Sequence, residues 1–134
     1  MSSHVGNNAF IFSDEIDVQS MNDLYGNDYV YVEEVFDTVL KEYSILTDNV
    51  ISSYSSGNLH ALKAAVHKIK PIFGFVGLVD IQQMCQQFEL VCQSAPSPDS
   101  LSNDYTQLKH KLISSRTLIE EERKKLALFN SQRS

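Results

Sequence analysis

The sequence of 134 residues predicts an all-α fold: an antiparallel up-down four-helix bundle with a short extra N-terminal helix. Four stretches carry apolar residues at steps of three and four, which is the spacing of one helix face and not of a strand. The connectors between these stretches are short, so consecutive helices should be antiparallel neighbours. Five Gly and three Pro are too few for the many tight turns of an all-β protein. The length fits one domain with one core.

The N-terminal part divides into an arm and a short helix. Residues 1–16 are rich in Ser and Asn and are acidic, and we expect them to form a flexible N-terminal arm. Asp17 is placed to cap a short helix over residues 18–24, which Gly26 would end.

The next predicted helix is the first long one. Asn27 or Asp28 can serve as its N-cap, and it should stop at residues 55–57, Ser-Ser-Gly. Its high content of β-branched residues allows a break near Thr47. Its apolar face consists of Val32, Val35, Phe36, Val39, Tyr43, Leu46, Val50 and Tyr54.

Three further helices complete the predicted bundle, which spans residues 17–129. Asn58 can cap a helix with the apolar stripe Leu59, Leu62, Val66, Ile69, Phe73 and Val76. After Gly77, another helix carries Leu78, Ile81, Met84, Cys85, Phe88, Val91 and Cys92 on one face. Beyond the connector at residues 94–100, the last helix carries Leu101, Tyr105, Leu108, Leu112, Ile119, Leu126 and Phe129. Residues 130–134 are expected to fray.

The cysteines and the chain ends indicate a cytoplasmic protein. Cys85 and Cys92 lie two helical turns apart, about 10.5 Å along the axis, whereas a disulfide needs Cα atoms within about 7 Å. No Cys-x-x-Cys pair is present, so a structural zinc site is not expected. The N-terminus lacks the features of a signal peptide, and no apolar stretch approaches the length of a membrane span. We expect a monomer that binds no membrane.

Charge is distributed unevenly along the chain. The formal net charge of −6 argues against a general nucleic-acid binder, which has a basic excess. Residues 1–58 sum to −9, and residues 59–134 sum to +3. The helix predicted after Asn58 contains three lysines, two histidines and no acid: Lys63, Lys68, Lys70, His60 and His67.

His67 should lie on the flank of this helix, beside its core stripe. The neighbours one or two turns away include small or compact residues that leave room for another protein: Ala64, Pro71 and Gly74. Lys63 and Lys70 lie about one turn on either side and can offset negative charge brought to the imidazole. Pro71 cannot donate a hydrogen bond to the carbonyl of His67, which costs a helix about 3 kcal/mol and suggests a helix end or a functional kink.

These residues resemble a known family. The segment His67-Lys68-Ile69-Lys70-Pro71-Ile72-Phe73-Gly74-Phe75-Val76-Gly77-Leu78 is similar to the signature of histidine-containing phosphotransfer (HPt) domains, H-x-[LI]-K-G-x-x-[AG]-x-[LV]-G-[LA]. The residues that end in Phe88-Glu89 resemble the family's following helix, and those from Leu24 to Asp28 resemble its lead-in. The resemblance covers roughly residues 20–128. Pro71 departs from the pattern, since the family most often has Gly there.

The resemblance implies a phosphorelay carrier. His67 would accept a phosphoryl group from the phospho-aspartate of one receiver domain and pass it to another. Lys70 would stabilise the phosphoryl group. Glu89, 22 residues after His67, would form a hydrogen bond with the ring nitrogen that does not react and so orient the histidine. The receiver would supply magnesium, so no cofactor or metal of the chain's own is expected. The partners would be receiver domains of response regulators or hybrid sensor kinases.

Contact with the receiver is expected around His67. The candidate contact residues are Lys63, Ala64, Lys68, Pro71, Gly74 and Phe75. Lys63 and Lys68 also fit a simpler role as solubilising charges. No Gly-rich phosphate loop is present, so the chain is expected to be a carrier and not a kinase.

Two other functions fit the same residues. The chain could be a non-catalytic helical adaptor that binds receiver or kinase domains without phosphotransfer. It could also be an enzyme that uses His67 and Glu89 as an acid–base pair on a small substrate. A carrier should present His67 on a convex surface, whereas an enzyme should place it in a cleft. A metal pair formed by His60 and His67 is disfavoured, because helical ligand pairs normally use a spacing of four.

Overall fold

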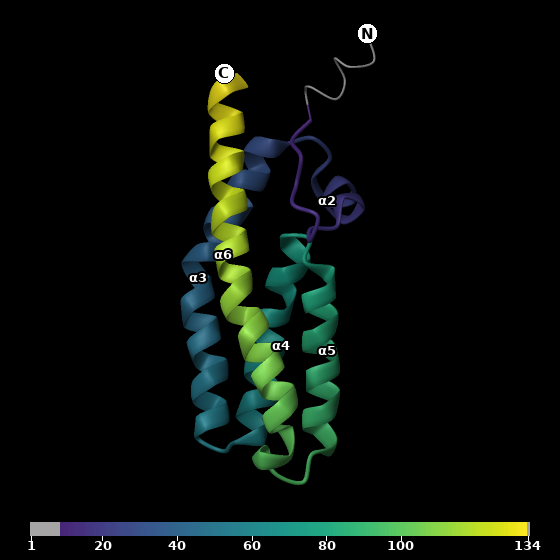
Figure 1. Cartoon of the computed structure of the whole chain (residues 1–134), viewed down its shortest axis with the longest axis vertical. Coiled ribbons are helices and arrows are strands. Elements are labelled where there is room, and N and C mark those ends of the chain that lie inside the picture. The colour runs from purple at the N-terminus through teal and green to yellow at the C-terminus, as the bar shows by residue number, and fades with distance from the viewer. Residues whose placement is uncertain (1–8, 134) are drawn as a thin grey trace.

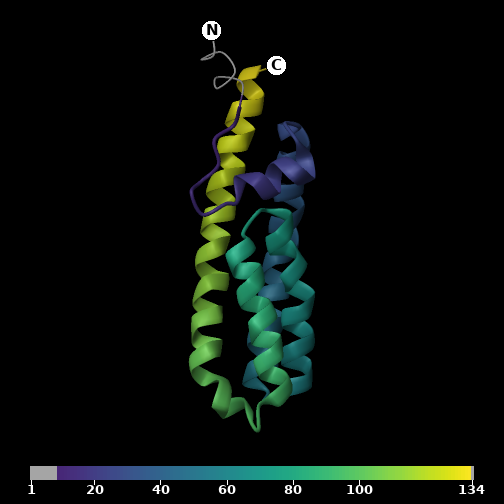
Figure 2. The same cartoon turned by 90° about the vertical axis from the view of Figure 1, so that its right-hand side faces the viewer.

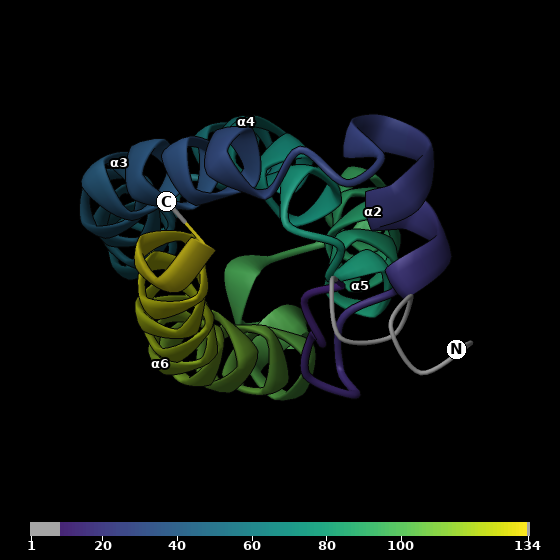
Figure 3. The ribbon, with the colours of Figure 1, turned by 90° about the horizontal axis from the view of Figure 1, so that it is seen from above.

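The computed structural model describes residues 9–133 and confirms the all-α bundle with a short additional helix in front of it. Four helices stand at the corners of a bundle and alternate in direction (Figures 1 and 3). The helices are α2 (Val18–Tyr25), α3 (Tyr29–Ser55), α4 (Leu59–Phe75), α5 (Val79–Ser94) and α6 (Ser102–Arg133), with a 3₁₀ turn, η1 (Pro98–Leu101), before α6. No strand occurs among the described residues.

Three helices begin at polar side chains that cap them. Asp17, Asp28 and Asn58 each accept a hydrogen bond from the backbone N–H three residues further along. Each bond satisfies one of the N–H groups that a helix start leaves without an intrahelical partner. The predicted caps are therefore confirmed, with Asp28 and not Asn27 at the start of α3. The helix α3 is continuous through Thr47, which is buried in the bundle.

The core lies along the axis of the bundle and contains the predicted apolar stripes, except that Val91 is exposed. Phe36, Tyr43 and Phe73 are almost completely buried at its centre, where the rings of Tyr43 and Phe73 meet edge to face. The Tyr43 hydroxyl donates a hydrogen bond of 2.6 Å to the carbonyl of Leu112, so its polar atom is satisfied inside the core. This bond ties α3 to α6 at the middle of the bundle.

The helices of the bundle differ in length. The helices α3 and α6 have 27 and 32 residues, whereas α4 and α5 have only 17 and 16. One end of the α3–α6 pair therefore extends beyond the α4–α5 turn, and α2 crosses above that turn (Figures 1 and 2). The segment before α2 adds a cluster of aromatic rings at this end, with centroids 4.9–6.4 Å apart: Phe10, Phe12, Tyr29 and Phe129.

The structure describes residues 9–16 of the expected flexible arm and residues 130–133 of the expected frayed terminus. Within the expected arm, Phe12 and Ile16 are buried, because the overhang offers an apolar surface that they cover. The helix α6 continues to Arg133, because the amide of Asn130 donates hydrogen bonds to the carbonyl of Tyr29 and to Glu33. Residues 1–8 and 134 lie outside the described residues.

A buried carboxylate holds the arm in place. Glu122 is 1% exposed, and its Oε1 accepts a hydrogen bond of 2.8 Å from the backbone N–H of Ser13. Its Oε2 lies 2.5 Å from Nζ of Lys125, which in turn lies 5.9 Å from the centre of the Phe10 ring. A buried carboxylate requires such partners, because desolvation disfavours its charge.

Gly77 makes the close turn between α4 and α5. Its φ of +73° lies in the left-handed region that favours glycine. A Cβ atom at this position would come within 2.8 Å of Ile16 and 2.9 Å of Met21. The Gly77 carbonyl also accepts a hydrogen bond of 2.8 Å from the N–H of Asp17. The arm and α2 are thereby packed directly onto the α4–α5 turn.

Pro71 lies inside α4, and the helix continues past it to Phe75. The proline ring is exposed, while Ile69, Ile72 and Phe73 on both sides of it are buried. Burial of these residues offsets the loss of one helical hydrogen bond, since each large apolar side chain contributes about 1.5–3 kcal/mol when fully buried.

Both cysteines are free thiols inside the bundle. Burial raises the pKa of Cys85 to about 12 and that of Cys92 to about 11, so both are protonated at neutral pH. Across residues 9–133, no helix combines the length and the apolar character that crossing a bilayer requires.

We predict that Glu122→Ala lowers the free energy of unfolding by about 1–3 kcal/mol, because the N–H of Ser13 loses its acceptor and the arm loses its anchor. Chemical denaturation in urea measures this difference. The matched control is Glu121→Ala, an exposed neighbour on the same helix, which should change stability by less than about 0.5 kcal/mol. Equal effects of the two substitutions would show that the buried contact contributes nothing.

Candidate functional site

His67 lies on the outer face of α4, near the middle of the bundle. Its side chain is 69% exposed, although its neighbours Val66 and Ile69 are fully buried. The helix is therefore fixed by its core side while the imidazole points to solvent. This is the position on the flank of the core stripe that the sequence predicts.

Glu89 on α5 holds one nitrogen of this ring. Its Oε1 lies 2.8 Å from Nδ1 of His67, and its side chain is only 9% exposed. Its Oε2 lies 2.7 Å from Nζ of Lys70, as an ion pair and not as a directed hydrogen bond. Burial alone would raise the pKa of Glu89, but Lys70 and His67 outweigh this effect, so the pKa is lowered. Glu89 is therefore ionised at neutral pH.

The contact with Glu89 determines which ring nitrogen of a neutral His67 is free. An ionised carboxylate can only accept hydrogen bonds, so Nδ1 must carry the proton that it donates to Glu89. The lone pair of Nε2 is then directed away from α5. An exposed imidazole with an unprotonated nitrogen is a nucleophile at neutral pH.

The facing side chains of α4 and α5 form a regular set of pairs, which we name the α4–α5 ladder. It comprises Lys63–Gln93, His67–Glu89, Lys70–Gln86 and Gly74–Gln82. The two residue numbers of every pair have the same sum, as expected for antiparallel helices in one fixed register. The Nζ atoms of Lys63 and Lys70 donate hydrogen bonds of 3.3 and 2.7 Å to the amide oxygens of their partners.

Gly74 forms the last step of the α4–α5 ladder. A Cβ atom there would come within 2.8 Å of the side-chain nitrogen of Gln82, so a larger residue would displace that amide. Of the other expected contact residues, Ala64, Lys68 and Pro71 are exposed, and Phe75 is 49% exposed. The structure thus brings His67, Lys70 and Glu89 into one cluster and leaves a largely open surface around it.

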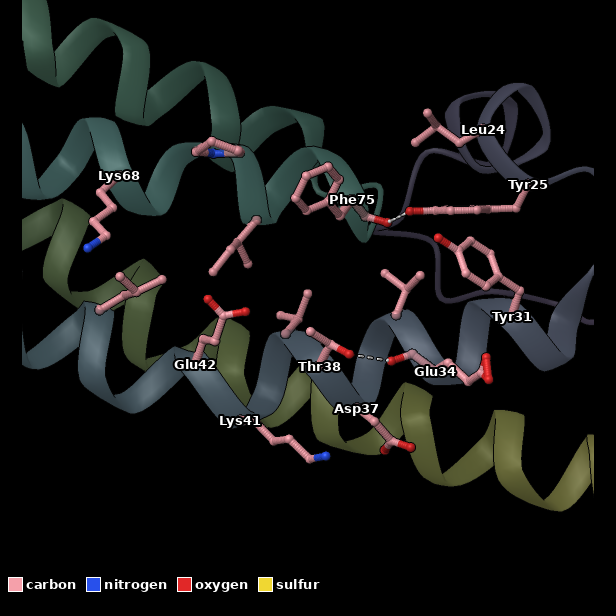
Figure 4. Close-up of a pocket in the computed structure, with 15 residues that line it drawn as sticks. Leu24, Tyr25, Tyr31, Glu34, Asp37, Thr38, Lys41, Glu42, Lys68 and Phe75 are labelled. Atoms are coloured by element: carbon pink, nitrogen blue, oxygen red, sulfur yellow. Dashed lines mark hydrogen bonds between the residues drawn. The ribbon is translucent and has the colours of Figure 1, made fainter.

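A groove runs beside this cluster, between α3 and α4, with α2 at one end (Figure 4). We name it the α3–α4 groove; its volume is about 920 Å³. Its apolar and aromatic lining comprises Leu24, Tyr25, Tyr31, Val35, Val39, Leu46, Pro71, Ile72 and Phe75. Charged residues also line it: Glu34, Asp37, Lys41, Glu42 and Lys68. The Tyr25 hydroxyl donates a hydrogen bond of 2.7 Å to the carbonyl of Phe75, which fixes α2 against the end of α4 (Figure 4).

The sequence reasoning missed Gln86 and Gln93 as members of the cluster. They precede Glu89 by three residues and follow it by four, so they share its helix face. Lys70 follows His67 by three residues, and Lys63 precedes it by four. The lysines thus have the same spacings from His67 as the glutamines have from Glu89, in the opposite direction along the chain. These matching spacings are the sequence signal from which the pairs Lys70–Gln86 and Lys63–Gln93 could have been predicted. In the described part of the chain, no group of three His, Cys, Asp or Glu side chains could hold a metal ion.

We predict that the charge of Glu89 stabilises the fold at pH 7 and ceases to do so in acid. Its pKa is lowered in the folded state, so the contribution is present above the unfolded pKa of about 4.3 and is lost as the pH falls through the folded value. In urea denaturation at pH 7, the free energy of unfolding of Glu89→Gln should be about 1–2 kcal/mol lower than that of the wild type. This difference should shrink below about pH 4. Glu121→Gln, on an exposed glutamate, should show no such convergence.

Comparison with known proteins agrees with this geometry. A family model, the Hpt domain, matches residues 30–118, a segment that contains His67, Lys70 and Glu89. No curated protein matches the sequence. Among solved structures, the chain is similar to the HPT domain from the Hpt sensor hybrid histidine kinase from Shewanella, with a TM-score of 0.68 and 11% identity. The match covers 80% of this chain and 92% of that one, which shows a common fold.

The family match spans well over half of the chain and includes α4 and α5, nearly all of α3 and the first part of α6. Hpt domains are phosphotransfer carriers and not kinases. The chain belongs to the Hpt domain family.

Proposed function

We propose that this chain is a cytoplasmic, monomeric phosphorelay protein that accepts a phosphoryl group on His67 from one receiver domain and passes it to another. The observation that carries the proposal is the exposed imidazole whose Nδ1 lies 2.8 Å from the buried carboxylate of Glu89. This arrangement leaves Nε2 as the reactive atom and exposes it to solvent outside the α3–α4 groove. Such exposure suits a reaction whose other half belongs to a second protein.

The transfer step needs no reactant other than the imidazole and the receiver's acyl phosphate. The lone pair of Nε2 attacks the phosphorus of the receiver's acyl phosphate, and the phosphorus–oxygen bond breaks. The bonding electrons leave with the aspartate, which becomes a carboxylate. The ring keeps its proton on Nδ1 and gains a positive charge, which the carboxylate of Glu89 stabilises at 2.8 Å. The reverse sequence delivers the phosphoryl group to the next receiver.

Lys70 is placed to stabilise the phosphoryl group. Its ammonium has three N–H donors, of which one bonds Gln86 and another faces Glu89. A donor is left for a phosphoryl oxygen, and the fixed position of the ammonium means that little reorganisation is needed at the moment of transfer. Lys63 and Lys68 add positive charge at the rim of the same surface.

The α3–α4 groove is the surface we assign to receiver docking. Lys68 (Figure 4) and Pro71 line the groove and follow His67 by one and four residues, so a protein bound there would lie next to the imidazole. Phe75 offers an exposed aromatic ring at its wall. Aromatic anchors in an apolar groove with a charged rim are typical of specific protein interfaces.

The placement of His67 favours a carrier over an enzyme with a small substrate. The residues that line the α3–α4 groove do not include His67, and its side chain is 69% exposed. An acid–base enzyme would need to enclose both its substrate and the histidine. The adaptor hypothesis predicts binding of receivers without transfer of label, which the following experiment distinguishes.

We predict that the folded wild type takes labelled phosphate from a phosphorylated cognate receiver domain and that His67→Gln takes none, because the nucleophile is absent. Phosphate transfer is followed by autoradiography of the separated proteins. His60→Gln, on an exposed histidine of the same helix, is the control and should label at the wild-type rate. Receiver binding without transfer by the wild type would favour the adaptor, and labelling of the His67 variant would move the site elsewhere.

We also predict that Phe75→Ala weakens receiver binding about tenfold, because a half-exposed aromatic anchor is removed from the docking groove. Isothermal titration against the same receiver measures the affinity. Ile113→Ala, on an exposed residue of α6 outside the groove, should bind like the wild type. Unaltered affinity of the Phe75 variant would place the docking surface on another face.

A further inference from the structure

Two glutamines of α5 hold the lysines that flank His67. Gln86 accepts a hydrogen bond of 2.7 Å from Lys70, and Gln93 accepts one of 3.3 Å from Lys63. The pairs lie immediately on either side of His67 and Glu89 in the α4–α5 ladder. Both lysines are therefore held across the helix pair by amides, and Lys70 also faces the carboxylate of Glu89.

Whether an amide or a carboxylate holds a lysine decides how much positive charge remains beside His67. An amide oxygen accepts a hydrogen bond from an ammonium group but carries no formal charge, so it positions the lysine without neutralising it. Within the α4–α5 ladder, two lysines face one carboxylate, and the local formal charge is +1 when His67 is neutral. A glutamate in place of either glutamine would remove this excess.

The partial burial of Lys70 strengthens this effect. Its side chain is only 19% exposed, and its ammonium lies 2.7 Å both from Gln86 and from Glu89. Charges near a protein surface interact more strongly than they do in bulk water, because the surrounding dielectric response is weaker. Because the two lysines outnumber the one carboxylate, the fixed ammonium groups beside the exposed imidazole are an electrostatic match for an incoming phosphoryl dianion.

We propose that Gln86 and Gln93 are positioning residues for phosphoryl transfer, which hold Lys70 and Lys63 beside His67 while leaving their positive charge available to the phosphoryl group. Gln86 has the larger part, because its bond is shorter and its lysine also faces Glu89. This inference rests on the proposed role of His67 as phosphoryl acceptor.

The test uses phosphoramidate, a small donor that needs no receiver domain. Nε2 of His67 attacks the phosphorus of the N-protonated donor, the phosphorus–nitrogen bond breaks, and the nitrogen leaves with the bonding electrons and its three hydrogens as ammonia. Phosphohistidine formation is followed by ³¹P NMR on the full chain. Gln86→Glu should react about tenfold more slowly than the wild type at low salt, because a negative charge is added about 3 Å from the Lys70 ammonium.

The matched control is Gln87→Glu, which adds the same charge one position further along. Gln87 lines a different groove, together with residues of α6 such as Asp104 and Gln107. This variant should react within about twofold of the wild type, since its charge lies on another face of α5 and Coulomb interactions weaken with distance. Equal rates for the two variants would overturn the proposal.

Salt separates an electrostatic role from a structural one. At about 1 M KCl the Debye length is about 3 Å, so the deficit of Gln86→Glu should shrink to about threefold or less. Thermal unfolding should show that both variants fold like the wild type. A deficit that persists unchanged in high salt would identify a structural defect and overturn the proposal.

A neutral substitution tests the positioning itself. Gln86→Met keeps the length of the side chain but accepts no strong hydrogen bond, and it should slow the reaction by about two- to fivefold, less than Gln86→Glu. Gln93→Glu should show a smaller, salt-sensitive deficit than Gln86→Glu. A larger effect at Gln93 would overturn the ranking of the two residues.

The donor also separates this proposal from the proposed function. If phosphoramidate labels His67 with the expected variant rates while no receiver transfers label, the positioning role stands and the relay function fails. If receivers transfer label but Gln86→Glu matches Gln87→Glu with both donors, the relay stands and the positioning role fails. Failure of the folded wild type to take label from either donor would overturn both.

Discussion

The antiparallel register of α4 against α5 is the constraint on which the site depends. Successive residues of a helix point about 100° apart, so a shift of one residue on α5 would turn Glu89 away from Nδ1 of His67. The same shift would separate Lys70 from Gln86. The register is set by the tight turn at Gly77 and by the buried side chains on either side of it. The geometry of one exposed imidazole is thus determined by packing in the interior of the bundle.

Glu89 links the stability of this region to its chemistry. A carboxylate with 9% of its side chain exposed is unfavourable in isolation, and it is retained here because Lys70 and His67 both face it. The same two contacts keep the proton of a neutral His67 on Nδ1 and fix the ammonium of Lys70. Removal of the carboxylate would therefore alter the tautomer of the ring and the position of the lysine together, so the effects of substituting these three residues should not be additive.

A second buried carboxylate organises the other end of the molecule. Glu122 accepts the N–H of Ser13 and pairs with Lys125, and the arm that it anchors covers the overhang of α3 and α6. Through Ile16 and the hydrogen bond to the carbonyl of Gly77, this arm reaches the turn that sets the α4–α5 register. Residues 10–16 thus pack against the bundle and support the turn from which the helices of the site extend.

The sequence by itself determined the fold class, the caps Asp17 and Asn58, most of the core stripes and the position of His67 on the flank of its helix. These properties follow from capping chemistry and from spacings of three and four, which act over short stretches of chain. The resemblance to HPt domains added Lys70 and Glu89. Only the tertiary structure decided that the arm is packed, that Glu122 is buried, that Gln86 and Gln93 hold the two lysines, and that α2, α3 and α4 enclose a groove. Each of these features joins side chains far apart in the sequence, and periodicity along one helix does not specify which face of another helix it will meet.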